Sequence, residues 1–417
     1  MFEFGRDLRR LFAQARESED LSWLELIGVD LLAVEARQQC TDAGRVSCSK
    51  PHPAWLRGAA LWREHARRTG SADSIRKALG AALDAARQAK TNDEIARAAI
   101  EKALTLLLRF DLSGGRGVLD MAAEAVPGTR ECRPATVALI SAVHARIRSR
   151  QARFEDDEKD GSGALMAAAA LLDAAIHEMD RTRAGNLDEL RMDRAALALE
   201  VGLTRRDPNL LDQAGRELLR LVESASPDYR PLTRARALTL CGAGMSALGA
   251  LADNEAARDQ GRAMFDAAAD QFTPDHSPLD WVVIQIVRGG APGAVSLAAL
   301  RQAEALTAGQ SLVVGAMARD MLIEGEIAAA TSTGDVPRLT DAETAARIRL
   351  ASNPSELDWA VEQIAMARIA RARALLTGSD DSAASLALLE AAEVASDHGL
   401  LDLAARARSL LAVRLTA

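Results

Sequence analysis

The sequence predicts an all-α protein in which helical hairpins stack into a solenoid. Alanine, the residue with the highest helix propensity, makes up about a fifth of the 417 residues, while aromatic residues make up only 3%. The phrase Ser277-Pro278-Leu279-Asp280-Trp281 returns as Ser355-Glu356-Leu357-Asp358-Trp359, and the two tryptophans are 78 residues apart. This spacing equals two units of about 39 residues, and repetition at such a period is typical of stacked helical hairpins.

Helix starts are predicted from capping chemistry, because the first backbone N–H groups of a helix lack partners. A Ser, Thr, Asn or Asp followed three positions later by an acid can satisfy two of them. This pattern occurs at Ser22…Glu25, Thr91…Glu94, Asn186…Glu189, Ser277…Asp280, Thr340…Glu343 and Ser355…Asp358. First-turn prolines add starts at Pro53, Pro134, Pro208, Pro231 and Pro278, and glycines indicate stops at Gly70, Gly202, Gly249 and Gly378.

Joining starts to stops gives eight predicted hairpins. They pair 51–70 with 72–90, 91–110 with 115–127, 133–153 with 163–181, 187–203 with 207–225, 230–249 with 252–272, 277–289 with 294–308, 309–332 with 335–351, and 355–377 with 381–397. Helices at 3–17, 21–40 and 399–415 flank them. We therefore expect N-terminal capping helices in 1–50, repeats in 51–398 with an acidic loop insertion at 154–163, and a C-terminal capping helix in 399–417.

The connectors between hairpins also repeat. Pro227-Asp228-Tyr229-Arg230-Pro231-Leu232 matches Pro274-Asp275-His276-Ser277-Pro278-Leu279 in four of six places. The paired helices, their period and the tryptophan phrase resemble divergent tetratricopeptide-type (TPR-like) repeats of bacterial proteins, over about residues 50–400. Most units are longer than the 34-residue consensus, and its paired Gly and Tyr are mostly absent. The resemblance implies a right-handed TPR-like α-solenoid of about eight hairpins, with a concave groove lined by the first helices.

Within the repeated phrase, Asp280 and Asp358 stand where capping acids stand, so we interpret them as structural and not as catalytic carboxylates. Ser277, Pro278 and Ser355 complete the two helix starts. Trp281 and Trp359 are expected to pack between hairpins, although either could instead line a ligand groove. The phrase therefore marks the repeats and provides no evidence of chemistry.

Other motifs also favour structural interpretations. The run Ser113-Gly114-Gly115-Arg116-Gly117 lacks the Lys-Ser/Thr ending of a phosphate loop and follows a helical pattern, which indicates a permissive turn. The acidic run from Glu155 to Asp160 is either a solvated insertion or a docking site for a basic partner. Residues 1–18 either cap the first repeat or contact a membrane or partner. The six histidines lack metal-site spacing, and we expect no metal or cofactor.

Composition bounds the partners and the compartment. The net charge of −8 argues against general nucleic-acid binding. The N-terminus carries charges where a signal peptide needs apolar residues, and no window is long and apolar enough for a transmembrane helix. Cys40, Cys48, Cys132 and Cys241 have no C-x-x-C spacing and fit reduced thiols. These features predict a cytoplasmic protein.

Three functions remain open from the sequence. The first is a non-catalytic scaffold or adaptor that binds a peptide or partner protein segment in the groove, with Arg236, Gln285, Gln363 and Arg371 as candidate contacts on first helices. The second is a sensor that responds to a peptide or small molecule. The third is an enzyme with an unrecognised site. No catalytic constellation is visible, so we expect no enzymatic activity. The sequence gives no partner identity or oligomeric state.

Overall fold

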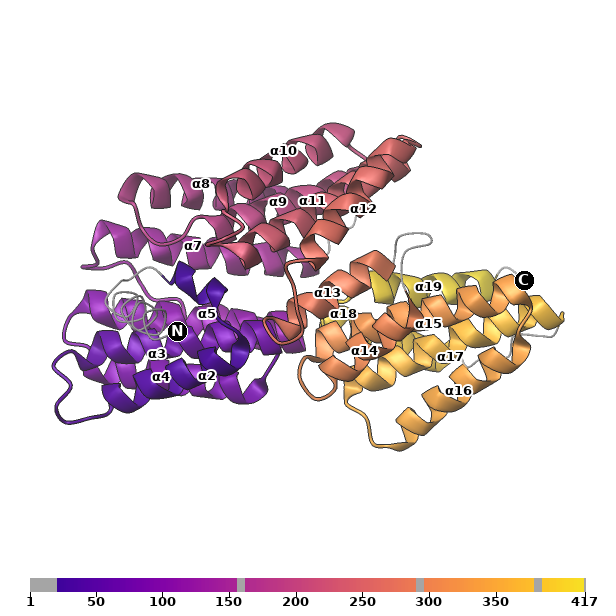
Figure 1. The fold of residues 1–417 in the computed structure, drawn as a ribbon, viewed down its shortest axis with the longest axis horizontal. Coiled ribbons are helices and arrows are strands. Elements are labelled where there is room, and N and C mark those ends of the chain that lie inside the picture. Colours follow the sequence, from indigo (N-terminus) through magenta and orange to yellow (C-terminus); the bar gives the residue numbers. More distant parts are fainter. Residues whose placement is uncertain (1–20, 156–161, 290–295, 379–384, 416–417) are drawn as a thin grey trace, which may run out of the picture. The chain divides into compact units, whose positions relative to one another are not determined.

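The computed structural model describes residues 21–155, 162–289, 296–378 and 385–415 (Figure 1). Over these ranges the chain forms eighteen α-helices, two short 3₁₀ helices and no strand, which confirms the all-α prediction. The first helices of the hairpins are α3 (Pro51–Thr69), α5 (Asn92–Ser113), α7 (Pro134–Gln151), α9 (Asp188–Arg205), α11 (Pro231–Leu251), α13 (Pro278–Gly289), α15 (Leu312–Thr333) and α17 (Glu356–Thr377).

The second helices complete these hairpins, and every predicted pair is present. They are α4 (Ala72–Gln88), α6 (Arg116–Glu124), α8 (Ser162–Thr182), α10 (Pro208–Ser224), α12 (Glu255–Ala269), α14 (Leu297–Thr307), α16 (Val336–Ala351) and α18 (Ser385–Asp397). Outside the pairs lie η1 (Ser22–Leu26), α2 (Val29–Ala43), η2 (Ala152–Phe154) and α19 (Leu401–Leu415). The helix expected at 3–17 falls outside the described residues.

The single helix predicted over 21–40 is wrong, because η1 ends at Leu26 and α2 starts only at Val29. Gly28 is extended between them, with φ −69° and ψ 164°. The Ser22…Glu25 pattern is not a capping box. The carboxylate of Glu25 instead accepts a hydrogen bond from the backbone N–H of Thr233, a residue far along the chain.

Several other start and stop signals are corrected. Thr340…Glu343 lies inside α16, whose first turn is capped by Asp335 through the N–H of Arg338. Gly202 and Gly249 lie within α9 and α11 and do not end them. A Cβ at Gly202 would lie 2.9 Å from the side chain of Leu211, so this glycine allows two helices of one hairpin to approach closely.

Other caps form as predicted. Asp207 accepts hydrogen bonds from the N–H groups of Asn209 and Leu210 at the start of α10, and Thr91 accepts one from the N–H of Glu94 before α5. At the start of α17, the hydroxyl of Ser355 accepts from the N–H of Asp358 at 3.2 Å and donates to its carboxylate at 2.7 Å. This pair satisfies one first-turn N–H group, that of Asp358, while the carboxylate of Asp358 accepts from the serine hydroxyl.

The helices group into two compact units. Unit 1 comprises Met1–Trp62, Ala81–Ile100 and Pro127–Ser277, and unit 2 comprises Arg63–Gly80, Glu101–Val126 and Pro278–Ala417. Helices α3, α4 and α5 therefore contribute residues to both units. The first tryptophan phrase is also divided, since Ser277 belongs to unit 1 and Pro278 to unit 2.

Within each unit the helices pack as stacked hairpins. In unit 1 each helix from α7 to α11 packs against its successor, and α9 also packs against α7 and α11. In unit 2 each helix from α13 to α18 packs against its successor, α15 also packs against α13 and α17, and α17 also packs against α19. First helices thus form a row inside each unit, as expected for a helical solenoid.

Small aliphatic residues fill the core between these rows. In unit 1, Leu172 of α8 is fully buried among alanines and leucines of α7 and α9. In unit 2, Trp281 is partly buried against a cluster that includes Leu279 and Val314, and Trp359 against one that includes Leu388 and Leu403. Alanine-rich faces let the helix axes approach closely.

Candidate functional site

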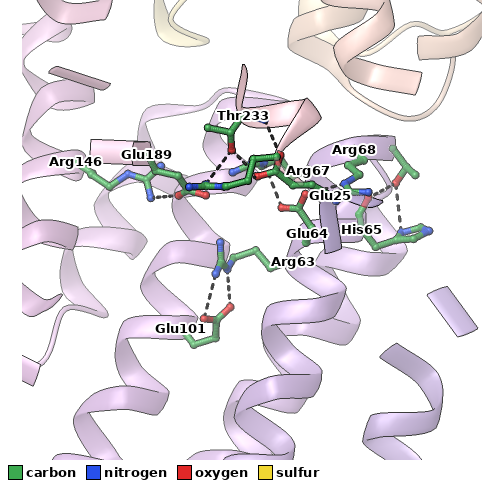
Figure 2. Close-up of polar contacts among 12 residues, drawn as sticks. Glu25, Arg63, Glu64, His65, Arg67, Arg68, Glu101, Arg146, Glu189 and Thr233 are labelled. Carbon is green, nitrogen blue, oxygen red and sulfur yellow. Dashed lines mark hydrogen bonds and ion pairs between the residues drawn. The ribbon is translucent and has the colours of Figure 1, made fainter. Parts of the chain in front are cut away.

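Charged side chains join neighbouring first helices in unit 1. The guanidinium of Arg146 on α7 bonds the carboxylates of Asp193 at 2.7 Å and Glu189 at 2.9 Å, both on α9. Figure 2 shows the contact between Arg146 and Glu189. Arg150, one turn after Arg146, also contacts Asp193 at 3.1 Å. Two arginines of one first helix therefore enclose one acid of the next.

This arrangement sets the ionisation of Asp193. Burial acts to raise the pKa of its carboxyl group, but the charges of Arg150 and Arg146 and their hydrogen bonds outweigh burial and lower it below the ordinary 3.8. The pKa of Asp193 is lower in the folded than in the unfolded protein, so its carboxylate contributes its full stabilisation of the fold at pH values above the unfolded-state pKa. This contribution is lost as the pH falls from about 4 through the folded-state pKa.

We therefore expect Asp193→Asn to remove stability at pH 7 and to flatten the dependence of stability on pH below pH 4. Urea unfolding followed by circular dichroism at several pH values measures both effects. Asp212→Asn, at an exposed ion pair with Arg216 on α10, is the matched control. If the stability of Asp193→Asn fell below pH 4 as steeply as that of wild type, the result would contradict this assignment.

In unit 2 the most buried of these contacts joins α15 to α17. Arg319 makes a bidentate pair with Glu362, with Nε–Oε1 and Nη2–Oε2 distances of 2.8 and 3.0 Å. The exposed fractions of the two side chains are only 9% and 3%. Glu304 of α14 contacts Arg349 of α16 at 2.9 Å and lies 3.7 Å from Arg319, so four helices meet at this network.

A second network in unit 2 surrounds Asp320 of α15. Its carboxylate contacts Arg368 of α17 at 2.5 Å and Arg406 of α19 at 2.6 Å. Arg368 also pairs with the more exposed Glu324. Burial lowers the pKa of Arg368, and Asp320 opposes that effect. Helices α15, α17 and α19 are thereby joined through one acid.

Arginine–glutamate pairs also occur in the N-terminal part of unit 2 (Figure 2). Arg63 of α3 pairs with the buried Glu101 of α5 at 2.6 Å. Arg68, with no exposed surface, pairs with Glu64 one turn earlier at 2.7 Å. His65 lies 2.8 Å from the hydroxyl of the buried Ser74. These contacts connect α3 to α4 and to α5.

The sequence interpretation missed these pairs. The pairs that join successive first helices are 38 to 48 residues apart, as for Arg63 with Glu101, Arg319 with Glu362 and Arg368 with Asp320. The available signal was an arginine and an acid on successive first helices, about one repeat period apart and in either order. A single sequence of 26% charged residues contains many such coincidences, so the spacing alone could not select the true pairs.

A different polar site lies at the start of α11 in unit 1 (Figure 2). The carboxylate of Glu25 accepts hydrogen bonds from the N–H of Thr233 at 2.8 Å and from its hydroxyl at 2.5 Å. Arg230 lies 3.5 Å from the same carboxylate and also binds Asp188 of α9. The N-cap position of α11 makes no side-chain capping bond of its own, so Glu25 supplies the cap from 208 residues away.

A pocket of about 410 Å³ lies between the α2–α3 turn and α4 in unit 1. Its lining includes Arg45, Cys48, Trp55, Asp84 and Gln88. Cys40 packs against the same buried alanine cluster as Trp55, and burial raises the pKa of its thiol. Burial also raises the pKa of Cys241 to about 11, so neither thiol is activated as a nucleophile.

The four candidate partner contacts lie on first helices with unequal exposure. Arg236 on α11, and Gln363 and Arg371 on α17, are half-buried. Gln285 on α13 is only 6% exposed, which leaves little of its side chain for a partner. Arg371 lies one turn after Arg368, on the same side of α17 as the Asp320 network.

The glycine-rich run after α5 forms a tight turn in unit 2. Gly114 has φ +69°, and the Nδ1 atom of His398 contacts the carbonyl oxygen of Ser113 at 2.9 Å. The hydroxyl of Ser311 donates to the carbonyl of Leu112 at 2.7 Å. The end of α5 is thus held by two remote turns.

Among the described residues, no group of three or more His, Cys, Asp or Glu side chains is placed to hold a metal ion. No helix in these ranges is long and apolar enough to cross a membrane. The acidic run is described only at its edge, where Glu155 pairs with Arg148 at 2.7 Å. Residues 156–161, interpreted as a solvated insertion or a docking site, and residues 1–18, interpreted as a cap or a docking segment, fall outside the described residues.

Comparisons with known proteins find matches among solved structures alone. No protein-family model matches the chain, and no curated protein matches it. Among solved structures, the chain is similar to a circular tandem repeat protein with novel repeat topology and enhanced subunit contact surfaces. The identity is 16%, the match covers 94% of this chain and 97% of that one, and the TM-score is 0.22.

Proposed function

We propose that this protein is a non-catalytic interaction scaffold that holds a segment of a partner protein against its first helices. The observation that supports this proposal is the row of arginine–acid contacts between successive first helices within each unit. Helical repeat folds are commonly used for protein–protein interaction, and these contacts place charged groups on successive first helices.

The contacts fall into two energetic classes. Buried pairs such as Arg319 with Glu362 fix the relative positions of neighbouring helices, because leaving one charge alone there is costly. Half-exposed pairs such as Arg153 with Glu200, at 36% and 30% side-chain exposure, contribute about 1 kcal/mol or less. A partner's carboxylate or guanidinium can therefore replace one member of a half-exposed pair at little cost, while the buried pairs keep the helices in place.

The finer parts of this proposal follow from the sequence. The repeats are proposed to be of the tetratricopeptide type and of bacterial origin, and the protein to work in the cytoplasm with its thiols reduced. Arg236, Gln363 and Arg371 are the proposed contacts to the partner, with Gln285 contributing least because of its burial. The partner is a protein or peptide and not a general nucleic acid.

The proposal is tested with Arg371→Glu, which reverses a half-buried charge beside the Asp320 network. Wild-type protein is expected to retain a stoichiometric partner from native lysate, identified by mass spectrometry. Arg371→Glu is expected to retain at least tenfold less, because the reversed charge repels the partner's acid and competes for Arg368. Circular dichroism checks that the variant keeps its helix content.

Arg216→Glu provides the matched control, since Arg216 is 70% exposed on the second helix α10 and pairs only within its own helix, with Asp212. This control is expected to retain the partner at the wild-type level. Equal loss from both variants would show general charge sensitivity and contradict the proposed surface. Stabilisation by a metabolite extract without any protein partner would favour the sensor hypothesis instead.

A further inference from the structure

We propose that the pocket between the α2–α3 turn and α4 binds an organic ammonium cation, carried either by a free amine or by a lysine side chain. The pocket has a volume of about 410 Å³, and all of its lining residues belong to unit 1. Small-ligand sites commonly have volumes of roughly 300–1,000 Å³. This inference goes beyond the proposed scaffold function and does not depend on it, since none of the four candidate partner contacts lines the pocket.

A half-buried indole ring forms one wall of the pocket. Trp55 of α3 packs against a cluster formed by Ala59 of the same helix and by Ala81 and Ala82 of α4. A Cβ at Gly44 would lie 3.5 Å from the Cζ2 atom of the ring, so the α2–α3 turn contacts the ring as well. The hairpin and the turn hold the indole in place, and part of it stays open to the pocket. The π face of an indole attracts cations more strongly than the ring of Tyr or Phe does.

A carboxylate on α4 supplies a counter-charge for a bound cation. Asp84 lines the same pocket, and its side chain is 35% exposed. Its partner Arg87, one turn later at 2.8 Å, is 74% exposed and does not line the pocket. Such an exposed pair contributes little to stability, so a ligand cation can replace Arg87 at the carboxylate at little cost. The side-chain amide oxygen of Gln88 offers a second acceptor in the same wall.

The helix ends in the wall favour a cation over an anion. Helix α2 ends at Ala43 and α4 at Gln88, both of which line the pocket, and the C-terminus of a helix carries partial negative charge. Helix α3 begins at Pro51, which has no N–H to donate to an anion. Arg45 also lines the pocket, but Asp42 pairs with its guanidinium at 2.9 Å. The wall therefore presents acceptors and partial negative charge to a ligand.

Ammonium groups with alkyl substituents match this lining. Val46 and Pro51 contribute apolar surface for methyl or methylene groups, while the ring of Trp55 and the carboxylate of Asp84 attract the charge. A divalent metal ion fits poorly, because hard cations need several oxygen ligands. Within the described ranges, no three His, Cys, Asp or Glu side chains are placed to supply them.

The experiment titrates the full chain with tetramethylammonium chloride and follows binding by ligand-observed NMR, with sodium chloride at equal ionic strength as the blank. Wild-type protein is expected to show saturable binding. Trp55→Leu is expected to weaken it about tenfold, and Trp55→Phe by less, because a phenyl ring still attracts a cation. Asp84→Asn is expected to weaken it about fivefold, because the counter-charge near the surface is lost.

Asp73→Asn is the matched control, because Asp73 is an exposed acid at the other end of α4, paired with Arg76. This control is expected to bind tetramethylammonium as wild type does. Circular dichroism checks the helix content of each variant. If Trp55→Leu does not fold, the conservative variants Trp55→Phe and Asp84→Asn carry the test. Absence of saturable binding by wild type, or equal binding by all the variants, would overturn the proposal.

Further ligands identify the source and the sign of the charge. N-acetyl-lysine amide that binds at least as tightly as butylammonium would assign the pocket to a lysine side chain, whereas a preference for butylammonium would assign it to a free amine. Sodium phosphate that binds to wild type but not to Arg45→Gln would assign the pocket to anions and overturn the proposal.

The outcome is separate from that of the scaffold test. Arg371 lies in unit 2, and the titration requires no partner protein. Arg371→Glu is therefore expected to bind tetramethylammonium with wild-type affinity, whatever it retains from lysate.

Discussion

Glu362→Ala is expected to lower the free energy of unfolding by about 3–5 kcal/mol. The carboxylate of Glu362 is 3% exposed and makes both hydrogen bonds to Arg319, whose side chain is 9% exposed. Truncation leaves the guanidinium buried with only the more distant Glu304, 3.7 Å away, as a counter-charge. Guanidinium chloride unfolding followed by circular dichroism measures the change.

A double variant separates the cost of an isolated buried charge from the cost of lost packing. Arg319→Met combined with Glu362→Leu removes both charges and fills the volume, so it is expected to lose much less than Glu362→Ala. Asp73→Asn, in the exposed contact with Arg76, serves as the control and is expected to leave the unfolding curve unchanged. Equal losses from the single and double variants would show that packing, and not an isolated charge, governs this position.

Gly114→Ala is expected to lower the free energy of unfolding by about 2–4 kcal/mol, which combines backbone strain with a steric clash. Gly114 has φ +69°, a conformation that L-residues rarely adopt. A Cβ there would lie 2.6 Å from Nδ1 and 2.8 Å from Cβ of His398. The turn after α5 would have to move away from His398, and the hydrogen bond to Ser113 would be lost.

Gly309→Ala is the matched control for this change. Gly309 has nearly the same backbone angle, φ +70°, but a Cβ there would meet nothing within 4 Å. Gly309→Ala is expected to lower the free energy of unfolding only by the cost of backbone strain, about 1 kcal/mol. Comparable losses at both glycines, measured by thermal unfolding, would show that the approach of His398 adds nothing beyond the backbone conformation.

Much of the fold was predictable because local chemistry decides it. Pro134, Pro208 and Pro231 each start a helix as expected, since proline lacks the N–H that a first turn leaves unpaired. Glycine was less informative. Gly378 ends α17 in a left-handed conformation, whereas Gly249 lies inside α11 because a neighbouring helix passes too close for a side chain.

The polar sites were not predictable, because tertiary packing and not local sequence decides which groups meet. Glu25 looked like a capping acid for the nearest helix, but its carboxylate caps α11 instead, and no local pattern specifies a partner so far along the chain. Glu343 likewise looked like a capping acid and instead binds Arg347 and Arg373. Capping patterns predict where an acid can stand, while tertiary packing decides which donor it meets.

The anchoring of residues 22–29 also bears on how unit 1 folds. Solenoids built only from neighbouring repeats can grow by local steps, which keeps their contact order low. Here the N-terminal segment contacts Thr233, Asp275 and His276, which lie far along the chain. These contacts cannot form until a nascent chain has reached the end of unit 1. Closing so long a loop costs entropy before any contact forms. Unit 1 is therefore expected to fold as one late, cooperative step and not hairpin by hairpin.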